Sequence, residues 1–313
     1  MSVTLEWSDY SIYGKCLHIY NDVAELYVSS EFGPRVLHYS LKGQPNTFYT
    51  NEGMNYIQKG PEFDNTFYPG AYWNVYGGNR LWKSPHFKQT NYYPDHDAVD
   101  VEVLNDGAIF RCKPQIFNNV QHTVEIHLAE NSSEVSMRYE IKNVSDEQKK
   151  IACWALSVCD IGGVSIFPQP QTRLGVLPNR HISLWDYSDM RDERVYWGGK
   201  YVALLGDPNA SSPIKIGINN VDGWACYLNK GFCFVLRYEH VEGGEYTDFG
   251  VSYESYANPY FLELESMSPT KELSYGESVT HAESWELFTY SKALDYKDES
   301  QVDLFVERYI KKG

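Results

Sequence analysis

Two glutamates on one face of a predicted strand, Glu263 and Glu265, have the spacing that proton-transfer chemistry needs. They lie in residues 260–269, where Leu262 and Leu264 would face one side of the strand and the glutamates the other. Side chains two positions apart on a strand are about 7 Å apart, so in a partly enclosed site at least one carboxyl should have a raised pKa. Such a group could act as a general base. A strand with a solvent-facing side also carries acids, and this alternative stays open.

A second candidate stretch, residues 76–87, has two glycines near its start and gathers cationic and aromatic side chains. It contains Arg80, Trp82, Lys83 and His86. An indole can stack on the C–H face of a sugar ring, while a guanidinium donates hydrogen bonds to hydroxyl oxygens. The stretch therefore suits a carbohydrate site. The alternative is a turn whose tryptophan anchors the core and whose arginine pairs with a surface acid.

The elements that would position these residues are strands. Residues 135–142 alternate strictly between apolar and polar side chains, and similar runs separated by Asn- and Ser-rich turns fill residues 98–167. This pattern favours an all-β fold, a large antiparallel sandwich. We expect a helix at residues 299–312, a long ordered loop lining a site at residues 46–76, and a single domain over residues 1–313.

Composition excludes several classes of function. With 27 basic against 42 acidic residues, the net charge of -15 disfavours nucleic acid as a partner. The six cysteines form no Cys-x-x-Cys pair, and no His-x-His or His-Glu-x-x-His motif occurs, so we expect no metal and no cofactor. The acidic N-terminus and the lack of a long apolar run predict a cytoplasmic protein without a membrane partner. Monomer and homodimer both remain open.

Short blocks spread in order over nearly the whole chain resemble the galactose mutarotase-like superfamily, and in particular a bacterial family within it. The main blocks are residues 30–36, 77–82, 154–158, 184–189, 215–217, 246–250 and 262–266. The resemblance implies a β-supersandwich of large antiparallel sheets with a sugar cleft on a concave face. In the aldose 1-epimerases of that fold, a late glutamate takes the proton of the anomeric hydroxyl. Glu265 lies in the block that is similar to that strand and is the expected base.

The histidine that serves as the acid in those epimerases has no counterpart here, because residues 152–156 read Ala-Cys-Trp-Ala-Leu. His86, or else Lys83, is then the expected proton donor. The remaining side chains expected to bind the sugar are Arg80, Trp82, Lys83, Trp154, Asp248, Glu254 and Glu263.

Two classes of function follow from these residues. The first is an aldose 1-epimerase-like isomerase that acts on a small-molecule carbohydrate by general acid/base catalysis. The second, favoured by the missing histidine, is a non-catalytic sugar-binding or sensing module. Glycoside hydrolysis is less favoured, since it needs two carboxylates about 5 to 9 Å apart across the sugar, and acids on one strand approach from one side.

Overall fold

Two large antiparallel sheets face each other in the computed structural model, which describes residues 2–87 and 91–311. Within these ranges the larger sheet has 11 strands. In spatial order they are β1 (Thr4–Asp9), β2 (Lys15–Tyr20), β3 (Ala24–Ser29), β4 (Val36–Leu41), β7 (Gly78–Ser84), β12 (Lys149–Asp160), β21 (Phe261–Met267), β20 (Tyr253–Ala257), β17 (Ile214–Ile218) and β14 (Ile182–Leu184), with β22 (Lys271–Leu273) paired to β12.

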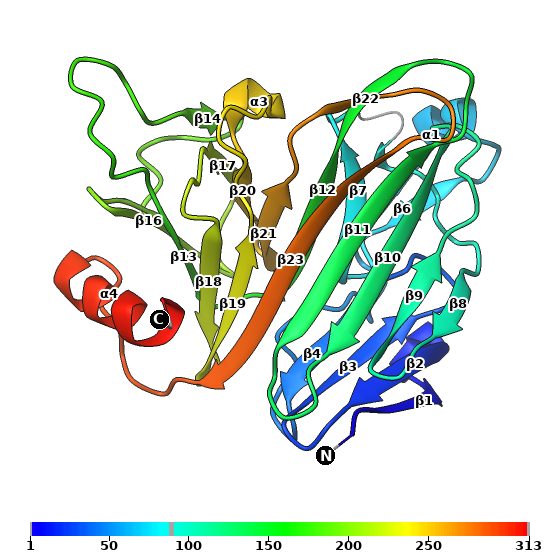
Figure 1. Cartoon of the computed structure of the whole chain (residues 1–313), viewed down its shortest axis with the longest axis horizontal. Helices are drawn as coiled ribbons and strands as arrows, with labels where there is room; N and C mark the ends of the chain where they lie inside the picture. The colour runs from blue at the N-terminus through cyan, green and yellow to red at the C-terminus, as the bar shows by residue number, and fades with distance from the viewer. Residues whose placement is uncertain (1, 88–90, 312–313) are drawn as a thin grey trace.

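The second sheet has 10 strands in the same described ranges. In spatial order they are β15 (Val195–Trp197), β16 (Tyr201–Leu205), β13 (Val164–Pro168), β18 (Trp224–Asn229), β19 (Phe232–Tyr238), β23 (Ser278–Thr289), β11 (Val135–Asn143), β10 (Val120–Leu128), β9 (Gly107–Arg111) and β8 (Asp100–Val103). In Figure 1, β23, β11 and β10 lie in front of β12 and β7 of the larger sheet. The architecture confirms the predicted all-β sandwich.

The core lies between the sheets and follows from the alternation of the sequence. Along β11 every second side chain is buried, while the side chains between them are exposed or half-buried. Leu262 and Leu264 of β21 belong to the same core. Because successive side chains of a strand point to opposite faces, Glu263 and Glu265 face the other side of the larger sheet.

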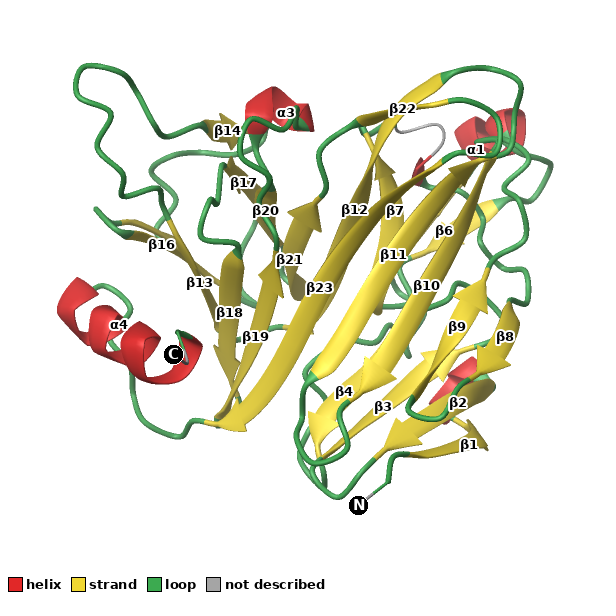
Figure 2. Ribbon diagram, in the orientation of Figure 1, coloured by secondary structure: helices red, strands yellow, loops and turns green. Residues whose placement is uncertain are grey.

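The chain ends in a helix on the outer face of the second sheet (Figure 2). Helix α4 (Glu299–Phe305) continues into a π-helical turn, η2 (Val306–Ile310), and residue 312 of the expected helix lies outside the described residues. Val302, Phe305 and Val306 are buried against Cys226 and Val235 of the sheet. None of the described helices is long and apolar enough to cross a membrane.

Residues 46–76, predicted to be one long loop, contain short regular elements instead. They include β5 (Ile57–Lys59), α1 (Pro61–Thr66) and β6 (Tyr72–Asn74), and β5 pairs with β6. Elements of 3 to 6 residues are too short for their periodicity to be read from a sequence. Two further short helical segments are η1 (Ser11–Tyr13) and α3 (Thr247–Gly250).

A polar network lies buried between the sheets, centred on Glu283 of β23. Its carboxyl group accepts hydrogen bonds from Tyr139 Oη at 2.8 Å, from Trp285 Nε1 at 2.9 Å, and from the hydroxyl of Ser266 on β21. The Ser266 hydroxyl also lies 2.6 Å from Nε2 of His281. Burial raises the pKa of Glu283, and the three hydrogen bonds oppose that rise.

We therefore expect Glu283→Gln to weaken the dependence of stability on pH. A carboxyl with a raised pKa binds more protons in the folded than in the unfolded state, so it destabilises the fold as pH rises above its ordinary value of 4.5. Glutamine keeps the shape and removes this titration. Urea unfolding at pH 5 and pH 8 should show a smaller loss of stability for the variant than for the wild type. Equal losses would show that Glu283 does not titrate in this range.

Candidate functional site

A cavity of about 270 Å³ lies on the face of the larger sheet that is turned away from the core. We call it the aromatic cavity, because most of its lining side chains are rings. The aromatic residues of its lining are Tyr56, Trp73, Trp82, Tyr92, Trp154, Trp185, Tyr187, Tyr256 and Phe261; the charged residues are Arg80, Lys215 and Glu263, joined by His86.

The strand register explains how residues distant in sequence converge here. On β12, Trp154 pairs with Trp82 of β7, and Leu156 pairs with both Arg80 of β7 and Glu265 of β21. The rings of Trp82 and Trp154 meet edge to face, with centroids 5.5 Å apart. The cavity floor is thus one continuous patch across adjacent strands.

The glycine pair in the second candidate stretch allows β7 to approach its neighbours. Gly77 and Gly78 have φ of +98° and +69°, and a Cβ on either would come within about 2 Å of a backbone oxygen, of Tyr49 and Val36 respectively. A side chain at either position would therefore force β7 away from its neighbours. Arg80 and Trp82 follow directly on the strand that this approach positions.

Arg80 and Glu263 form an ion pair inside the cavity. Nη2 of Arg80 lies 3.0 Å from Oε1 of Glu263, and the guanidinium lies 4.4 Å from the centre of the Trp82 ring. Burial raises the pKa of Glu263, Arg80 opposes the rise, and Glu265 adds to it. Nε and Nη1 of Arg80 are buried and have no hydrogen-bond partner among the described residues.

A second ionic cluster lies beside this pair, centred on Lys215 of β17. Its Nζ is 2.6 Å from Oε2 of Glu254 and 2.8 Å from Oε2 of Glu265, and it lies 4.5 Å and 4.8 Å from the ring centres of Trp154 and Trp185. Burial alone would lower the pKa of Lys215, but Glu254 and Glu265 outweigh it, so the pKa is raised above its ordinary value. Lys215 is therefore held as an ammonium ion.

The structure does not place Glu265, the expected base, at the cavity surface. Its side chain is fully buried, and its Oε2 accepts a hydrogen bond from Trp154 Nε1 at 2.8 Å as well as from Lys215. Large side chains from the adjacent strand β12 and from β17, two strands away, thus cover it. Glu263, two residues earlier on the same face, does line the cavity and becomes the candidate base.

Glu254 and Asp248 also lie away from the position expected of them. Glu254 is fully buried beneath the cavity, where it pairs with Lys215. Asp248 lies in α3, is half-buried, and does not belong to the lining of the aromatic cavity. Neither carboxylate is placed to bind a sugar hydroxyl directly.

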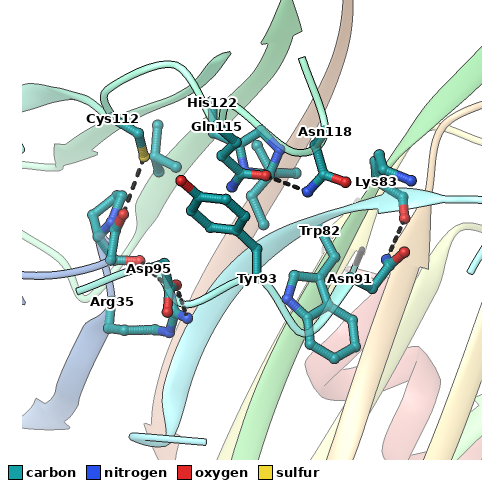
Figure 3. A pocket seen from close by; sticks show the side chains of 14 residues that line it. Arg35, Trp82, Lys83, Asn91, Tyr93, Asp95, Cys112, Gln115, Asn118 and His122 are labelled. Atoms are coloured by element: carbon teal, nitrogen blue, oxygen red, sulfur yellow. Dashed lines mark hydrogen bonds and ion pairs between the residues drawn. The ribbon is translucent and has the colours of Figure 1, made fainter. Parts of the chain in front are cut away.

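Lys83 lines a different and much smaller cavity of about 20 Å³, together with Arg35, Asp95, Cys112 and His122 (Figure 3). It precedes Ser84 on β7 and follows Trp82, so it points to the opposite face of the strand from the tryptophan. Burial lowers the pKa of Lys83 to about 8, and nearby Lys149 adds to this. The space holds about one water molecule, which excludes a monosaccharide.

His86 lies at the rim of the aromatic cavity and keeps contact with solvent. Its ring centroid is 5.8 Å from that of Trp82 and 5.5 Å from that of Trp154. Partial burial lowers the pKa of His86, and the cations of Lys215, Lys83 and Arg80 lower it further. The ring is therefore neutral at pH 7 and is a weak proton donor.

Sequence reasoning gave no individual site role to several of the residues that line the cavity. Tyr56 and Trp73 belong to the segment predicted as a site-lining loop, and Trp185 and Lys215 lie in blocks that carried the family resemblance without an assigned role. In the described part of the chain, no cluster of three or more His, Cys, Asp or Glu side chains could hold a metal ion.

Comparison with known proteins identifies the fold. No protein-family model and no curated protein matches the sequence. Among solved structures, the chain is similar to a TPR-domain containing protein from Parabacteroides distasonis, with a TM-score of 0.59 and 12% identity over 91% of this chain and 48% of that one. This chain therefore spans about half the length of that protein.

Two further structures match over nearly their full length. A galactose mutarotase-like protein from Clostridium acetobutylicum has a TM-score of 0.56 and 11% identity, covering 92% of this chain and 99% of that one. A galactose mutarotase-like protein from Lactobacillus casei has a TM-score of 0.54 and 12% identity, covering 87% and 100%. The fold is therefore similar to that of these galactose mutarotase-like proteins, as the sequence blocks predicted.

Proposed function

We propose that this mutarotase-like fold binds a monosaccharide in the aromatic cavity and interconverts its anomers, as an aldose 1-epimerase-like enzyme. The observation that carries the proposal is the Arg80–Glu263 pair inside a cavity walled by indole and phenol rings. Aromatic faces suit the C–H face of a pyranose, and the carboxylate of Glu263 in the cavity lining can accept hydrogen bonds from its hydroxyl groups. A small-molecule carbohydrate is thus the proposed ligand, and a cytoplasmic location remains a prediction.

In this reaction Glu263 takes the proton of the anomeric hydroxyl. As the C1=O bond forms, the bond between C1 and the ring oxygen breaks, and the ring oxygen receives a proton. Rotation about the C1–C2 bond and reversal of these steps give the other anomer. A buried carboxylate with a raised pKa is a suitable base, because its pKa is then closer to neutral pH.

The cavity supports hydrolysis of glycosides less well. Among the described residues that line it, Glu263 is the only carboxylate. A glycosidase needs a second carboxyl group on the other side of the scissile bond, and the nearest candidates, Glu254 and Glu265, are both covered.

A non-catalytic sugar-binding module is the second candidate function. It is favoured by the covered position of Glu265, since the residue that resembles the epimerase base cannot reach a ligand without movement of Trp154 and Lys215. In that case the same cavity would bind a sugar without turnover.

Polarimetry of freshly dissolved α-D-galactose and α-D-glucose, together with anomer exchange measured by NMR across other aldoses, distinguishes the two functions. The epimerase proposal expects the protein to accelerate the approach to anomeric equilibrium. Saturable quenching of tryptophan fluorescence without acceleration would support the binding module. Neither acceleration nor binding for any aldose would contradict both.

A further inference from the structure

Lys215 is the ammonium group that shares the aromatic cavity with the candidate base. Its side chain is 8% exposed and lines the cavity, while Nζ donates a hydrogen bond to Glu265 and forms an ion pair with Glu254. An ammonium group has three N–H donors, so these two contacts leave one donor for the cavity. The rings of Trp154 and Trp185 hold the group in place.

The sheet register places this donor across the cavity from Glu263. Lys215 of β17 is paired with Tyr256 of β20, and Tyr256 is paired with Glu263 of β21. Two strand spacings correspond to about 10 Å between the backbones of Lys215 and Glu263. Long side chains converging from these positions can reach two oxygens bound to the same carbon, as the anomeric and ring oxygens of a pyranose are.

The other proton donors suggested by the sequence are less well placed. His86 sits at the rim of the aromatic cavity, and Lys83 lines the small cavity and not the aromatic one. Among the cationic residues lining the aromatic cavity, Arg80 is already hydrogen-bonded to Glu263, the candidate base, and its other two nitrogens are buried. Lys215 is the remaining cation in that lining.

Glu254 lies directly behind Lys215 and can supply protons to it. Glu254 has no exposed surface, and its Oε2 is 2.6 Å from Nζ of Lys215. Burial raises the pKa of Glu254, Lys215 opposes this rise, and the neighbouring Glu265 and Asp248 add to it. Glu254 is therefore in position to exchange a proton with Nζ of Lys215.

We propose that Lys215 is the general acid of anomer exchange, replacing the absent histidine, and that Glu254 reprotonates it. The inference rests on the proposed epimerase function. As Glu263 takes the anomeric proton and the bond from C1 to the ring oxygen breaks, Nζ of Lys215 gives a proton to the ring oxygen. The resulting amine accepts the proton of Glu254. Ring closure returns each proton to its donor, so no other reactant is consumed.

Lys215→Arg tests the inference, because a guanidinium keeps the positive charge and both carboxylate partners but does not release a proton near neutral pH. We expect the rate constant for exchange of α-D-galactose or α-D-glucose to fall about 100-fold or more. The affinity for 1,5-anhydro-D-glucitol, which has a pyranose ring but no anomeric hydroxyl, should change little. Glu254→Gln should lower kcat and leave that affinity unchanged.

A second variant controls for loss of activity that is caused by misfolding. Lys215→Met combined with Glu265→Gln removes one charge of each sign from the cluster, and near-UV circular dichroism would verify its fold. It too should bind 1,5-anhydro-D-glucitol and lose anomer exchange. Exchange within about twofold of wild type in either folded variant would overturn the role of Lys215 and leave the epimerase proposal intact. A wild-type protein that accelerates no aldose would overturn both.

Discussion

Replacing Glu263 by glutamine lowers the rate constant of anomer exchange by about 100- to 10,000-fold, the contribution typical of a general base. Glutamine has the same shape, and its carbonyl oxygen can still accept the hydrogen bond from Nη2 of Arg80 that Glu263 accepts at 3.0 Å. Binding of 1,5-anhydro-D-glucitol should therefore persist while exchange is lost. Line-shape or saturation-transfer NMR on an equilibrated aldose measures the rate.

Lys83→Met is the matched control for this loss. Lys83 is next to Trp82 on β7, but it lines the small cavity on the other side of the strand. Its replacement should leave both exchange and binding unchanged. If Glu263→Gln retained wild-type exchange, or if Lys83→Met lost it, the base would have to be sought elsewhere.

Lys215→Met is expected to destabilise the fold by about 3–5 kcal/mol, the usual cost of removing one partner of a buried ion pair. Glu254 and Glu265 are both fully buried and would lose the cation that compensates them. Burial and the neighbouring acids already raise the pKa of Glu254, and without Lys215 nothing in the cluster opposes that rise. The folded variant would then bind more protons than its unfolded chain.

The sign of the pH dependence follows from this difference in bound protons. An acid whose pKa is raised in the folded state destabilises the fold increasingly as pH rises from its ordinary value of 4.5 toward the raised one. Lys215→Met should therefore be more stable at pH 5 than at pH 8, by a larger margin than the wild type. Urea unfolding at both pH values measures this, with Lys215→Met/Glu265→Gln expected to recover part of the loss. A variant as stable as wild type at pH 8 would contradict the assigned cluster.

The fold could be predicted from the sequence because each sheet has one side that faces the core. Strict alternation in β11 and in residues 261–265 predicts strands and assigns each side chain to a face, and the structure confirms both. Short elements such as β5 and α1 could not be predicted. Three to six residues are too few to show either the helical or the strand periodicity of apolar side chains.

The site could be predicted only in part, because its arrangement depends on contacts between strands. Strand parity places Glu263 and Glu265 on one face, but it cannot tell which of them is covered. That depends on Trp154 of the adjacent strand β12 and on Lys215 of β17, two strands away, whose positions are set by the register of the sheet. The role of Lys215 could not be predicted either, because its carboxylate partners are about 40 to 50 residues away in sequence.

The most direct test of a sugar-binding aromatic cavity is a crystal structure of the protein soaked in a mixture of monosaccharides. We predict an ordered pyranose stacked on Trp82 or Trp154, with its anomeric carbon between Glu263 and Lys215. A sugar bound elsewhere, with the aromatic cavity empty at saturating concentration, would contradict the account.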